Sequence, residues 1–281
     1  MQYLTLNNGI KMPILGFGTY LIPPEETKQA VLDAIDVGYR LIDTAQYYKN
    51  EKEVGEAIKE CGIGREELFI TTKVWISNFG YEECLDSMKE SFEKLGLDYI
   101  DLVLIHQPFS DYYGAYRALE DLYESGLIKA IGVSNFYPDR LTDMCLFNRK
   151  VIPQINQVET NPFNAQYAAQ ANMEKNGVQM QAWAPFGQGK NGMFENETLI
   201  KIGEKNGGKT PAQVILRWLV ERSVIVLAKS THKERMAENL NIFDFALDEE
   251  DMMEIMELDN GETLFFNHQN PEVVERFDDI S

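Results

Sequence analysis

The sequence predicts an α/β fold of the (β/α)₈ or TIM barrel type. Eight apolar segments of strand length alternate along the chain with amphipathic segments of helical periodicity. The strand-like segments are continuous apolar runs, which is typical of parallel strands covered on both faces. Eight such units in about 250 residues match a closed barrel. A doubly wound open sheet is the alternative, although it usually has fewer strands and a glycine fingerprint at its first turn.

The first unit illustrates the pattern. The apolar run at 14–18 is followed by "PEETKQAVLDAIDVG", where apolar residues recur at helical spacing and Gly38 ends the helix. The other strands are expected at 40–43, 68–73, 99–106, 128–136, 153–159, 178–185 and 224–230. The other helices are expected near 51–60, 84–95, 113–125, 138–147, 166–176, 198–206, 211–221, 233–240 and 249–257.

Two segments lie outside this repeat. "YLTLNNGIKM" alternates apolar and polar residues around Asn8-Gly9, which predicts a β-hairpin with a type I′ turn ahead of the barrel. The tail after Gly261 lacks strong periodicity, and we expect it to pack over the barrel mouth. Because no linker composition interrupts the chain, we expect one domain over residues 1–281.

Composition excludes several classes of function. The formal net charge is −19, which disfavours binding to nucleic acid and to anionic membranes. Cys61, Cys84 and Cys145 lie far apart without a metal-ligand spacing, so we expect neither disulfides nor a bound metal. The sequence starts without a signal-peptide pattern and has no apolar run of membrane-spanning length, which favours a cytoplasmic protein.

The predicted strands end in polar or functional residues. In such barrels the carboxyl ends of the strands form one face, and this face carries the active site. Packing alone does not require polar groups there, so their convergence predicts a site. The residues at the ends are Gly18, Asp43, Lys73, His106, Ser134 with Asn135, Gln157, Trp183, and Lys229 with Ser230.

Three of these side chains, Asp43, Lys73 and His106, form a plausible proton-transfer group together with Tyr48, five residues after Asp43. Tyrosine is a poor acid near neutral pH, since its reference pKa is about 10. An ammonium from Lys73 would lower the pKa of the nearby Tyr48, and Asp43 would hold Lys73 charged. His106 would orient a carbonyl oxygen. Taken alone, His106 would more often be a core histidine with satisfied nitrogens.

Seven segments together resemble the aldo-keto reductase family, including its bacterial aldehyde and ketone reductases. They are "GYRLIDTAQYYKNEKEVGEAI", "FITTKVW", "DLVLIHQP", "GVSNF", "INQVE", "AWAP" and "AKSTHKERMAENL". The resemblance implies the catalytic tetrad Asp43, Tyr48, Lys73 and His106, with Tyr48 as proton donor. It also implies a small-molecule carbonyl substrate and reduction to an alcohol by NADPH. We expect a monomer or a weak oligomer.

The resemblance also assigns binding residues. Ser134, Asn135 and Gln157 match residues that hold the nicotinamide carboxamide, and Trp183 stands where an aromatic ring stacks on the nicotinamide. Around the adenine and the 2′-phosphate, the matching residues are Lys229, Ser230, Arg235, Glu238 and Asn239. For the substrate we expect contacts from Tyr20, Trp75, His106 and Gln107, together with the 186–197 loop and the tail.

Two other functions stay open from the sequence. "GEKNGGKT" at 203–210 matches the phosphate-binding pattern of nucleotidases, but a helical segment precedes it where that motif needs a strand. Gly207 and Gly208 are typical of a helix end, and Thr210-Pro211 of a helix start. A non-catalytic relative that binds NADP(H) as a redox sensor is the other alternative.

Overall fold

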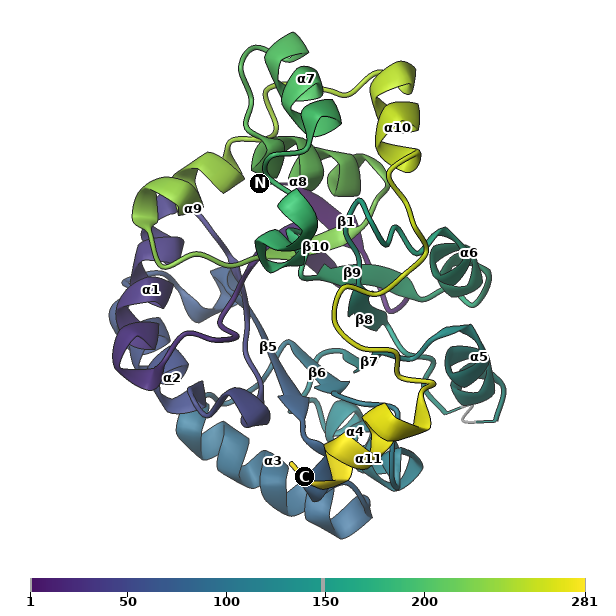
Figure 1. Ribbon diagram of the computed structural model, residues 1–281. Helices are drawn as coiled ribbons and strands as arrows, with labels where there is room; N and C mark the ends of the chain where they lie inside the picture. The colour runs from purple at the N-terminus through teal and green to yellow at the C-terminus, as the bar shows by residue number, and fades with distance from the viewer. Residues whose placement is uncertain (1, 148–149, 281) are drawn as a thin grey trace.

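A computed structural model describes residues 2–147 and 150–280. Within these residues, eight parallel strands close into a barrel in the order β10-β3-β4-β5-β6-β7-β8-β9 (Figure 1). The strands are β3 (Leu15–Gly18), β4 (Leu41–Asp43), β5 (Phe69–Val74), β6 (Leu102–Ile105), β7 (Ile131–Ser134), β8 (Ile155–Glu159), β9 (Gln179–Trp183) and β10 (Ile225–Ala228). The last strand closes the barrel by pairing with the first, with Val226 opposite Leu15. The predicted barrel is therefore confirmed.

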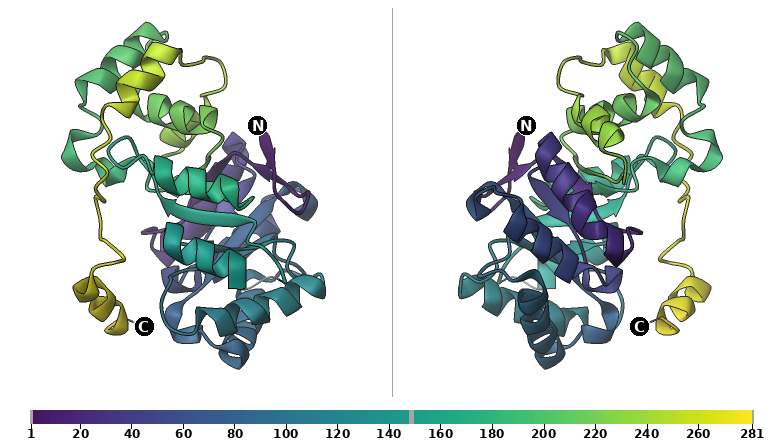
Figure 2. Two further views of the ribbon diagram at one scale, coloured as in Figure 1. Left: turned by 90° about the vertical axis from the view of Figure 1, so that its right-hand side faces the viewer. Right: turned by 90° about the vertical axis from the view of Figure 1, so that its left-hand side faces the viewer.

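Helices surround the barrel, as Figures 1 and 2 show. Their bounds are α1 (Pro24–Val37), α2 (Glu51–Glu60), α3 (Tyr81–Leu95), α4 (Tyr112–Glu124), α5 (Pro138–Phe147), α6 (Tyr167–Lys175), α7 (Glu197–Lys205), α8 (Pro211–Glu221), α9 (Lys233–Leu240) and α10 (Glu249–Met256). These bounds agree closely with the predicted segments. No helix in the described part of the chain is long and apolar enough to cross a membrane.

The core has two parts, one between strands and helices and one inside the barrel. The inner part consists of Leu6, Met12, Leu41, Phe69, Leu102, Leu104, Ala130, Ile155, Ile225 and Leu227. Gly16 makes room for it, because a Cβ there would lie 2.5 Å from the Leu41 side chain. Such close packing fills the barrel with side chains and leaves room for ligands only at its mouth.

An antiparallel hairpin of β1 (Tyr3–Thr5) and β2 (Lys11–Pro13) covers the amino ends of the strands. Asn7 Nδ2 donates to the carbonyls of Pro153 and Gly177, at 3.0 and 2.9 Å, which lie ahead of β8 and β9. The predicted type I′ turn is wrong. Gly9 N–H bonds the Leu6 carbonyl, so Asn7 and Asn8 are the central residues, and of the turn only Gly9 has a positive φ, 86°.

The tail crosses the mouth, as predicted, and then forms a helix that we did not predict, α11 (Pro271–Asp278). Figure 2 shows the tail and the hairpin at opposite ends of the barrel. Asn270 caps α11 by accepting from the Glu272 N–H at 3.1 Å, and Pro271 occupies its first position. Glu159 at the end of β8 anchors the tail by accepting hydrogen bonds from Thr263 Oγ1 and from Leu264 N–H, the latter at 2.9 Å.

The segment 203–210 is a helix end followed by a helix start. Gly207 and Gly208 adopt left-handed φ values of 82° and 80° just after α7. Thr210 caps α8 and forms a capping box with Gln213. Lys209 Nζ contacts Asp244 at 2.7 Å. A phosphate-binding loop would follow a strand, so the geometry argues against the nucleotidase alternative.

Candidate active site

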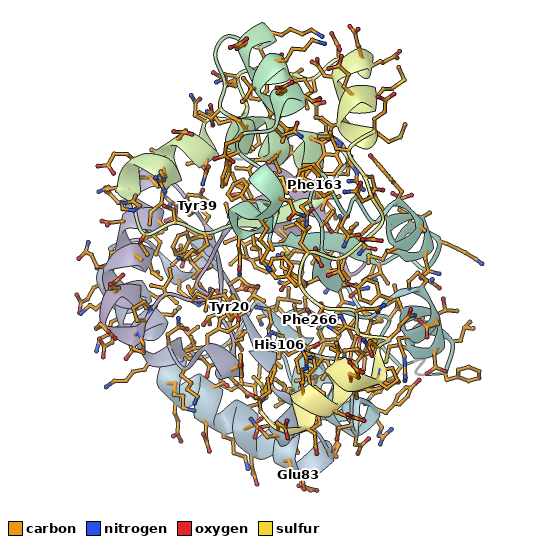
Figure 3. All side chains as sticks on the ribbon, viewed as in Figure 1. Tyr20, Tyr39, Glu83, His106, Phe163 and Phe266 are labelled. Atoms are coloured by element: carbon orange, nitrogen blue, oxygen red, sulfur yellow. The ribbon has the colours of Figure 1, made fainter. Side chains whose placement is uncertain are left out.

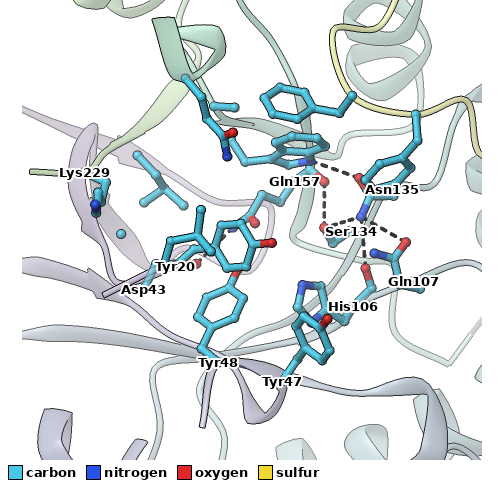
Figure 4. Close-up of a pocket in the computed structure, with 18 of the residues that line it drawn as sticks. Tyr20, Asp43, Tyr47, Tyr48, His106, Gln107, Ser134, Asn135, Gln157 and Lys229 are labelled. Carbon is cyan, nitrogen blue, oxygen red and sulfur yellow. Dashed lines mark hydrogen bonds between the residues drawn. The ribbon is translucent and has the colours of Figure 1, made fainter. Parts of the chain in front are cut away.

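A cavity of about 860 Å³ opens at the carboxyl ends of the barrel strands. Figure 3 shows Tyr20, His106 and Phe266 over the middle of the barrel, and Figure 4 shows the cavity in detail. The predicted residues in its wall are Tyr20, Asp43, Tyr48, Trp75, His106, Gln107, Ser134, Asn135, Gln157, Trp183 and Lys229. Side chains that are far apart in the sequence are thus brought together as expected.

Lys73 lies behind the cavity wall and forms hydrogen bonds with two wall residues, Asp43 and Tyr48. It is fully buried on β5, and its Nζ donates to Asp43 Oδ1 in an ion pair. The same nitrogen donates to the Thr44 carbonyl at 3.0 Å and to the Tyr48 hydroxyl at 3.3 Å. The three donors of the ammonium are therefore all used, and one points to the phenol oxygen.

The pKa of Tyr48 is shifted in the opposite direction from our prediction. Burial, and then the negative charge of Asp43, raise the pKa of the Tyr48 phenol well above its usual value. Burial also lowers the pKa of Lys73 and raises that of Asp43, and their mutual attraction opposes both shifts. Tyr48 is therefore protonated near neutral pH, and the raised pKa makes its phenol a weaker acid than we predicted.

His106 follows β6 and is 8% exposed. Its ring lies 5.7 Å from the Tyr48 ring and 5.1 Å from the Trp75 ring, centroid to centroid. Burial, and then the positive charge of Lys73, hold the pKa of His106 well below its usual value, so the imidazole is neutral. Its buried Nδ1 has no hydrogen-bond partner among the described residues. It is thus not a core histidine with both nitrogens satisfied.

Gln46, which we did not predict as a site residue, holds the turn that carries Tyr48. This short turn spans Gln46–Tyr48. Gln46 Oε1 accepts from the Trp75 backbone N–H at 2.9 Å, and its Nε2 donates to Ser91 Oγ at 3.1 Å. The turn is therefore fixed to the end of β5 and to α3.

Asn50 fixes the other side of the same turn and was also missed. It is fully buried, and its Oδ1 accepts from Thr44 Oγ1 at 2.8 Å. Its Nδ2 donates to the carbonyls of Thr19 and Ile22 at 3.2 and 3.3 Å. Asn50 thus joins the loop after β3, which carries Tyr20, to the loop after β4. A sequence gives no direct signal for such a residue, because its partners come from separate loops.

A cluster of amides and an indole forms one side of the cavity. Asn135 adopts a left-handed φ of 65°, which asparagine tolerates better than most residues. Its Oδ1 accepts from Trp183 Nε1 at 2.9 Å, and its Nδ2 donates to the His106 carbonyl at 3.0 Å. Gln157 Nε2 donates to Asp43 Oδ2 at 2.9 Å, and Ser134 Oγ donates to the Gln157 carbonyl at 2.9 Å.

The residues after β10 include two cations, Lys229 and Arg235, that have no carboxylate partner in the described part of the chain. Lys229 and Arg235 are exposed and form no ion pair within residues 2–147 and 150–280, whereas Lys233 contacts Asp36 at 2.6 Å. Ser230, Arg235, Glu238 and Asn239 lie outside the cavity wall, in the adjoining loop and α9. An anionic group beside α9 would meet Lys229 and Arg235 as free partners.

The aromatic side of the cavity is built partly by the tail. Trp75 is 6% exposed and stacks on Tyr47 with centroids 4.1 Å apart, while Tyr20 is 44% exposed at the rim. From the tail, Phe265, Phe266, Val273, Arg276, Phe277 and Ile280 complete the wall. None of these tail residues was predicted individually.

Gln107 is held by His268, a turn residue of the tail just ahead of α11. His268 is 6% exposed, and its Nε2 lies 2.9 Å from Gln107 Oε1. The tail carries His268 inward, so it is buried although it lies in a turn. The His268 imidazole packs against the aromatic rings of Phe109, Tyr137, Phe266 and Phe277.

The residues present suit a nicotinamide cofactor. Amide and hydroxyl groups line one end of the cavity, and two cations that form no ion pair with any described residue lie beside it. Within the described residues, no group of three His, Cys, Asp or Glu side chains could hold a metal ion.

Comparison with known proteins agrees with this chemistry. Residues 14–260 match the aldo/keto reductase family. The chain is 46% identical over 259 residues to the glyoxal reductase of Bacillus subtilis strain 168, with 92% of each chain covered. An aldo-keto reductase from a Medee basin deep-sea metagenome library has a TM-score of 0.91 and 43% identity, with 95% of this chain and 98% of that chain covered. The Bombyx mori aldo-keto reductase in complex with NADP has a TM-score of 0.89 and 35% identity, with 94% and 95% covered.

Fold, cavity and similarity together define an NAD(P)H-dependent oxidoreductase that acts on carbonyl groups. The chain belongs to the aldo/keto reductase family.

Proposed function

We propose that this protein reduces an aldehyde or ketone to an alcohol with NADPH, and that Tyr48 is the general acid. One observation carries the proposal. The Tyr48 hydroxyl lies 3.3 Å from the buried Lys73 ammonium, in the wall of the same cavity as His106. The cofactor, when bound, supplies the hydride.

Each member of the tetrad has a distinct task. Tyr48 gives its phenolic proton to the carbonyl oxygen as that oxygen becomes negative. Lys73 then stabilises the phenolate through its hydrogen bond, and Asp43 keeps Lys73 charged. The neutral imidazole of His106 donates a hydrogen bond to the same carbonyl oxygen and so orients it.

For the cofactor, we assign one set of residues to each of its ends. Ser134, Asn135 and Gln157 bind the carboxamide of the nicotinamide, and the Trp183 ring stacks on it. The ribose 2′-phosphate and the adenine are bound by Lys229, Ser230, Arg235, Glu238 and Asn239. Lys229 and Arg235 form no ion pair with the described residues, and two such cations in a chain of net charge −19 support NADPH over NADH.

The substrate is a small carbonyl compound, in contact with Tyr20, Trp75, His106 and Gln107. The name of the Bacillus subtilis relative supports aldehydes. We propose that the chain acts as a single domain, as a monomer or weak oligomer, without nucleic acid, membrane or metal.

The test is to follow NADPH oxidation with a panel of aldehydes, ketones and sugars. We expect steady turnover of at least one aldehyde that depends on Tyr48. If NADPH binds but no carbonyl compound in the panel is reduced, the protein is instead a cofactor-binding relative without catalytic activity.

A further inference from the structure

A buried polar side chain lies one layer below the active-site cavity. Gln181 is the middle residue of β9, and it is fully buried. Side chains two residues apart on a strand share a face, so Gln181 points into the barrel like Trp183, which lines the cavity. Gln181 itself is not part of the cavity wall. Its neighbour on β10 is Ile225, a member of the apolar inner core.

The Gln181 amide uses only one of its two ends. Its Oε1 accepts a hydrogen bond from Gln157 Nε2 at 3.0 Å. Its Nε2 is buried and has no hydrogen-bond partner among residues 2–147 and 150–280. A buried donor without a partner destabilises the folded state, and an apolar side chain would avoid this loss. Stability therefore does not explain a glutamine at this position, and its oxygen is the atom to which a role can be assigned.

The Gln181 oxygen completes the hydrogen bonding of the Gln157 nitrogen. Gln157 lies beside Gln181 on β8, and its Nε2 also donates to Asp43 Oδ2 at 2.9 Å. A side-chain amide has two N–H groups, so these two hydrogen bonds use both of them. A carboxylate can only accept, which turns the nitrogen of Gln157 toward Asp43 and requires an acceptor from Gln181. The Gln157 amide is thereby held at two points.

The Gln157 oxygen is left for a ligand. Gln157 and Asp43 both line the cavity, as Figure 4 shows. The Gln157 Oε1 accepts no hydrogen bond from any residue in 2–147 or 150–280. A nicotinamide carboxamide has an N–H₂ group that can donate to such an oxygen. Because both N–H groups of Gln157 are held, its oxygen keeps one direction.

We propose that Gln181 is a positioning residue that orients the nicotinamide carboxamide for hydride transfer by holding Gln157. It acts only through Gln157, since it does not line the cavity. The same amide is hydrogen-bonded to Asp43, which pairs with Lys73, so the hydride and proton sides of the reaction share one buried network. This inference rests on the proposed carbonyl reduction and on our assignment of Gln157 to the carboxamide.

Gln181→Met tests the inference, because methionine has the length of glutamine and only a weak acceptor. We expect kcat to fall by roughly 10-fold, since small displacements of reacting groups slow a reaction strongly. The Kd of NADPH should rise by less than about 5-fold, the size of one neutral hydrogen bond. The primary isotope effect with NADPH deuterated at the transferred position should increase, because hydride transfer becomes the slower step. Gln181→Leu should behave in the same way. Gln181→Glu should keep most of the turnover, since its carboxyl oxygen also accepts from Gln157.

A second measurement needs no turnover. In the acetylpyridine analogue of NADP⁺, a methyl ketone replaces the carboxamide, so the N–H₂ donor is lost. In fluorescence titrations, we expect the wild type to bind NADP⁺ about 5-fold more tightly than the analogue. Gln181→Met should lose most of this preference. Its urea midpoint should equal or exceed that of the wild type, because the substitution removes an unpaired buried N–H group.

Gln179→Met is the matched control. It makes the same substitution two residues earlier on β9, where Gln179 Nε2 donates to the Ser223 carbonyl at 2.6 Å and lies outside the cavity wall. The control should leave kcat, the isotope effect and the cofactor preference unchanged.

Wild-type kcat and isotope effect in Gln181→Met would overturn the inference. So would a loss of turnover with an unchanged isotope effect and an unchanged preference for NADP⁺, because Gln181 would then be only structural. If the wild type reduces no carbonyl compound but its preference for NADP⁺ still depends on Gln181, the proposed reduction is contradicted and the positioning role stands.

Discussion

Two tyrosines stand side by side at the reacting end of the cavity, and they have different partners. The Tyr48 hydroxyl receives a hydrogen bond from Lys73, whereas Tyr47 stacks on Trp75. A phenol that only packs can lose its hydroxyl at little cost to the reaction. A phenol that transfers a proton cannot.

This difference gives the first expected outcome. Tyr48→Phe should lower turnover by about 10²- to 10⁴-fold, the usual contribution of general acid catalysis, while NADPH affinity stays nearly constant. Tyr47→Phe is the control and should retain most of the turnover. Steady-state rates with fluorescence titrations of NADPH check both. Turnover near the wild-type value in Tyr48→Phe would show that the proton donor lies elsewhere.

The second prediction concerns Arg235 and Lys229, the two cations that follow β10 and that we assign to the 2′-phosphate of NADPH. Arg235→Ala should weaken NADPH binding by roughly 10- to 100-fold, since hydrogen bonds to charged groups are worth about 1.5–3 kcal/mol. NADH lacks the 2′-phosphate and should be little affected. Lys229→Met should behave similarly. Lys233→Ala is the control, because Lys233 already contacts Asp36. Equal losses for both cofactors in Arg235→Ala would contradict the assignment.

Residue types at strand ends were predictable, but their environments were not. The spacing from Asp43 to Tyr48 and the placement of Lys73 and His106 follow from the strand pattern and from the resemblance. The pKa of Tyr48 does not, because it depends on how deeply the tertiary structure buries the phenol. For the same reason Asn50 could not be found, since its partners come from separate loops.

At the scale of elements, the 203–210 segment shows how a motif can arise from helix boundaries. Gly203 is a packing residue of α7, since a Cβ there would lie 2.0 Å from the Lys209 backbone carbonyl oxygen. The glycines after it end the helix, and Thr210 starts the next one. Helix packing and helix capping therefore account for these residues without a bound phosphate.

We therefore expect Gly203→Ala to lower the free energy of unfolding by about 1–3 kcal/mol, because overpacking against backbone outweighs the better helix propensity of alanine. Urea denaturation measures this loss. Lys209→Ala should leave carbonyl reduction essentially unchanged, since Lys209 contacts Asp244 and not the cavity. ATP hydrolysis by the wild type that disappears in Lys209→Ala would support the nucleotidase alternative.

The tail helix was missed although its signals are present in the sequence. Asn270 and Pro271 form a helix start, and Val273, Phe277 and Ile280 recur at helical spacing. The helix covers only Pro271–Asp278, so its apolar periodicity is short. Length does not explain the miss, because α9 and α10 are also eight residues long and were predicted. The tail helix differs in lying outside the strand-helix repeat that guided the other predictions.

At the scale of the whole molecule, stability should depend on pH through buried histidine. Burial lowers the pKa of His268 to about 4. An unfolded histidine has a pKa of about 6.5, so between these values the unfolded chain binds a proton that the folded chain does not. Above that range the protonation of His268 does not affect the free energy of unfolding. As the pH falls through the range, the free energy of unfolding decreases.

When the pH is lowered from about 7.5 to about 5.5, His268 alone should therefore lower the free energy of unfolding by about 1 kcal/mol. His268→Gln keeps a donor for Gln107 and should remove this loss. His232→Gln is the matched control, because it makes the same substitution at an exposed histidine outside the tail. Urea denaturation at both pH values checks all three proteins. If the stability of His268→Gln depends on pH as strongly as that of the wild type, His268 is not the cause of the pH dependence.

The hairpin at the closed end of the barrel has a practical consequence for how the enzyme can be attached to a solid support. A tether joined ahead of Tyr3 would hold the molecule by the end remote from the mouth, so small molecules would reach the cavity freely. A tether placed after Ile280 would start from a residue that itself lines the cavity. Immobilised enzyme should therefore keep its activity when it is oriented by the hairpin, and lose part of it when it is oriented by the tail.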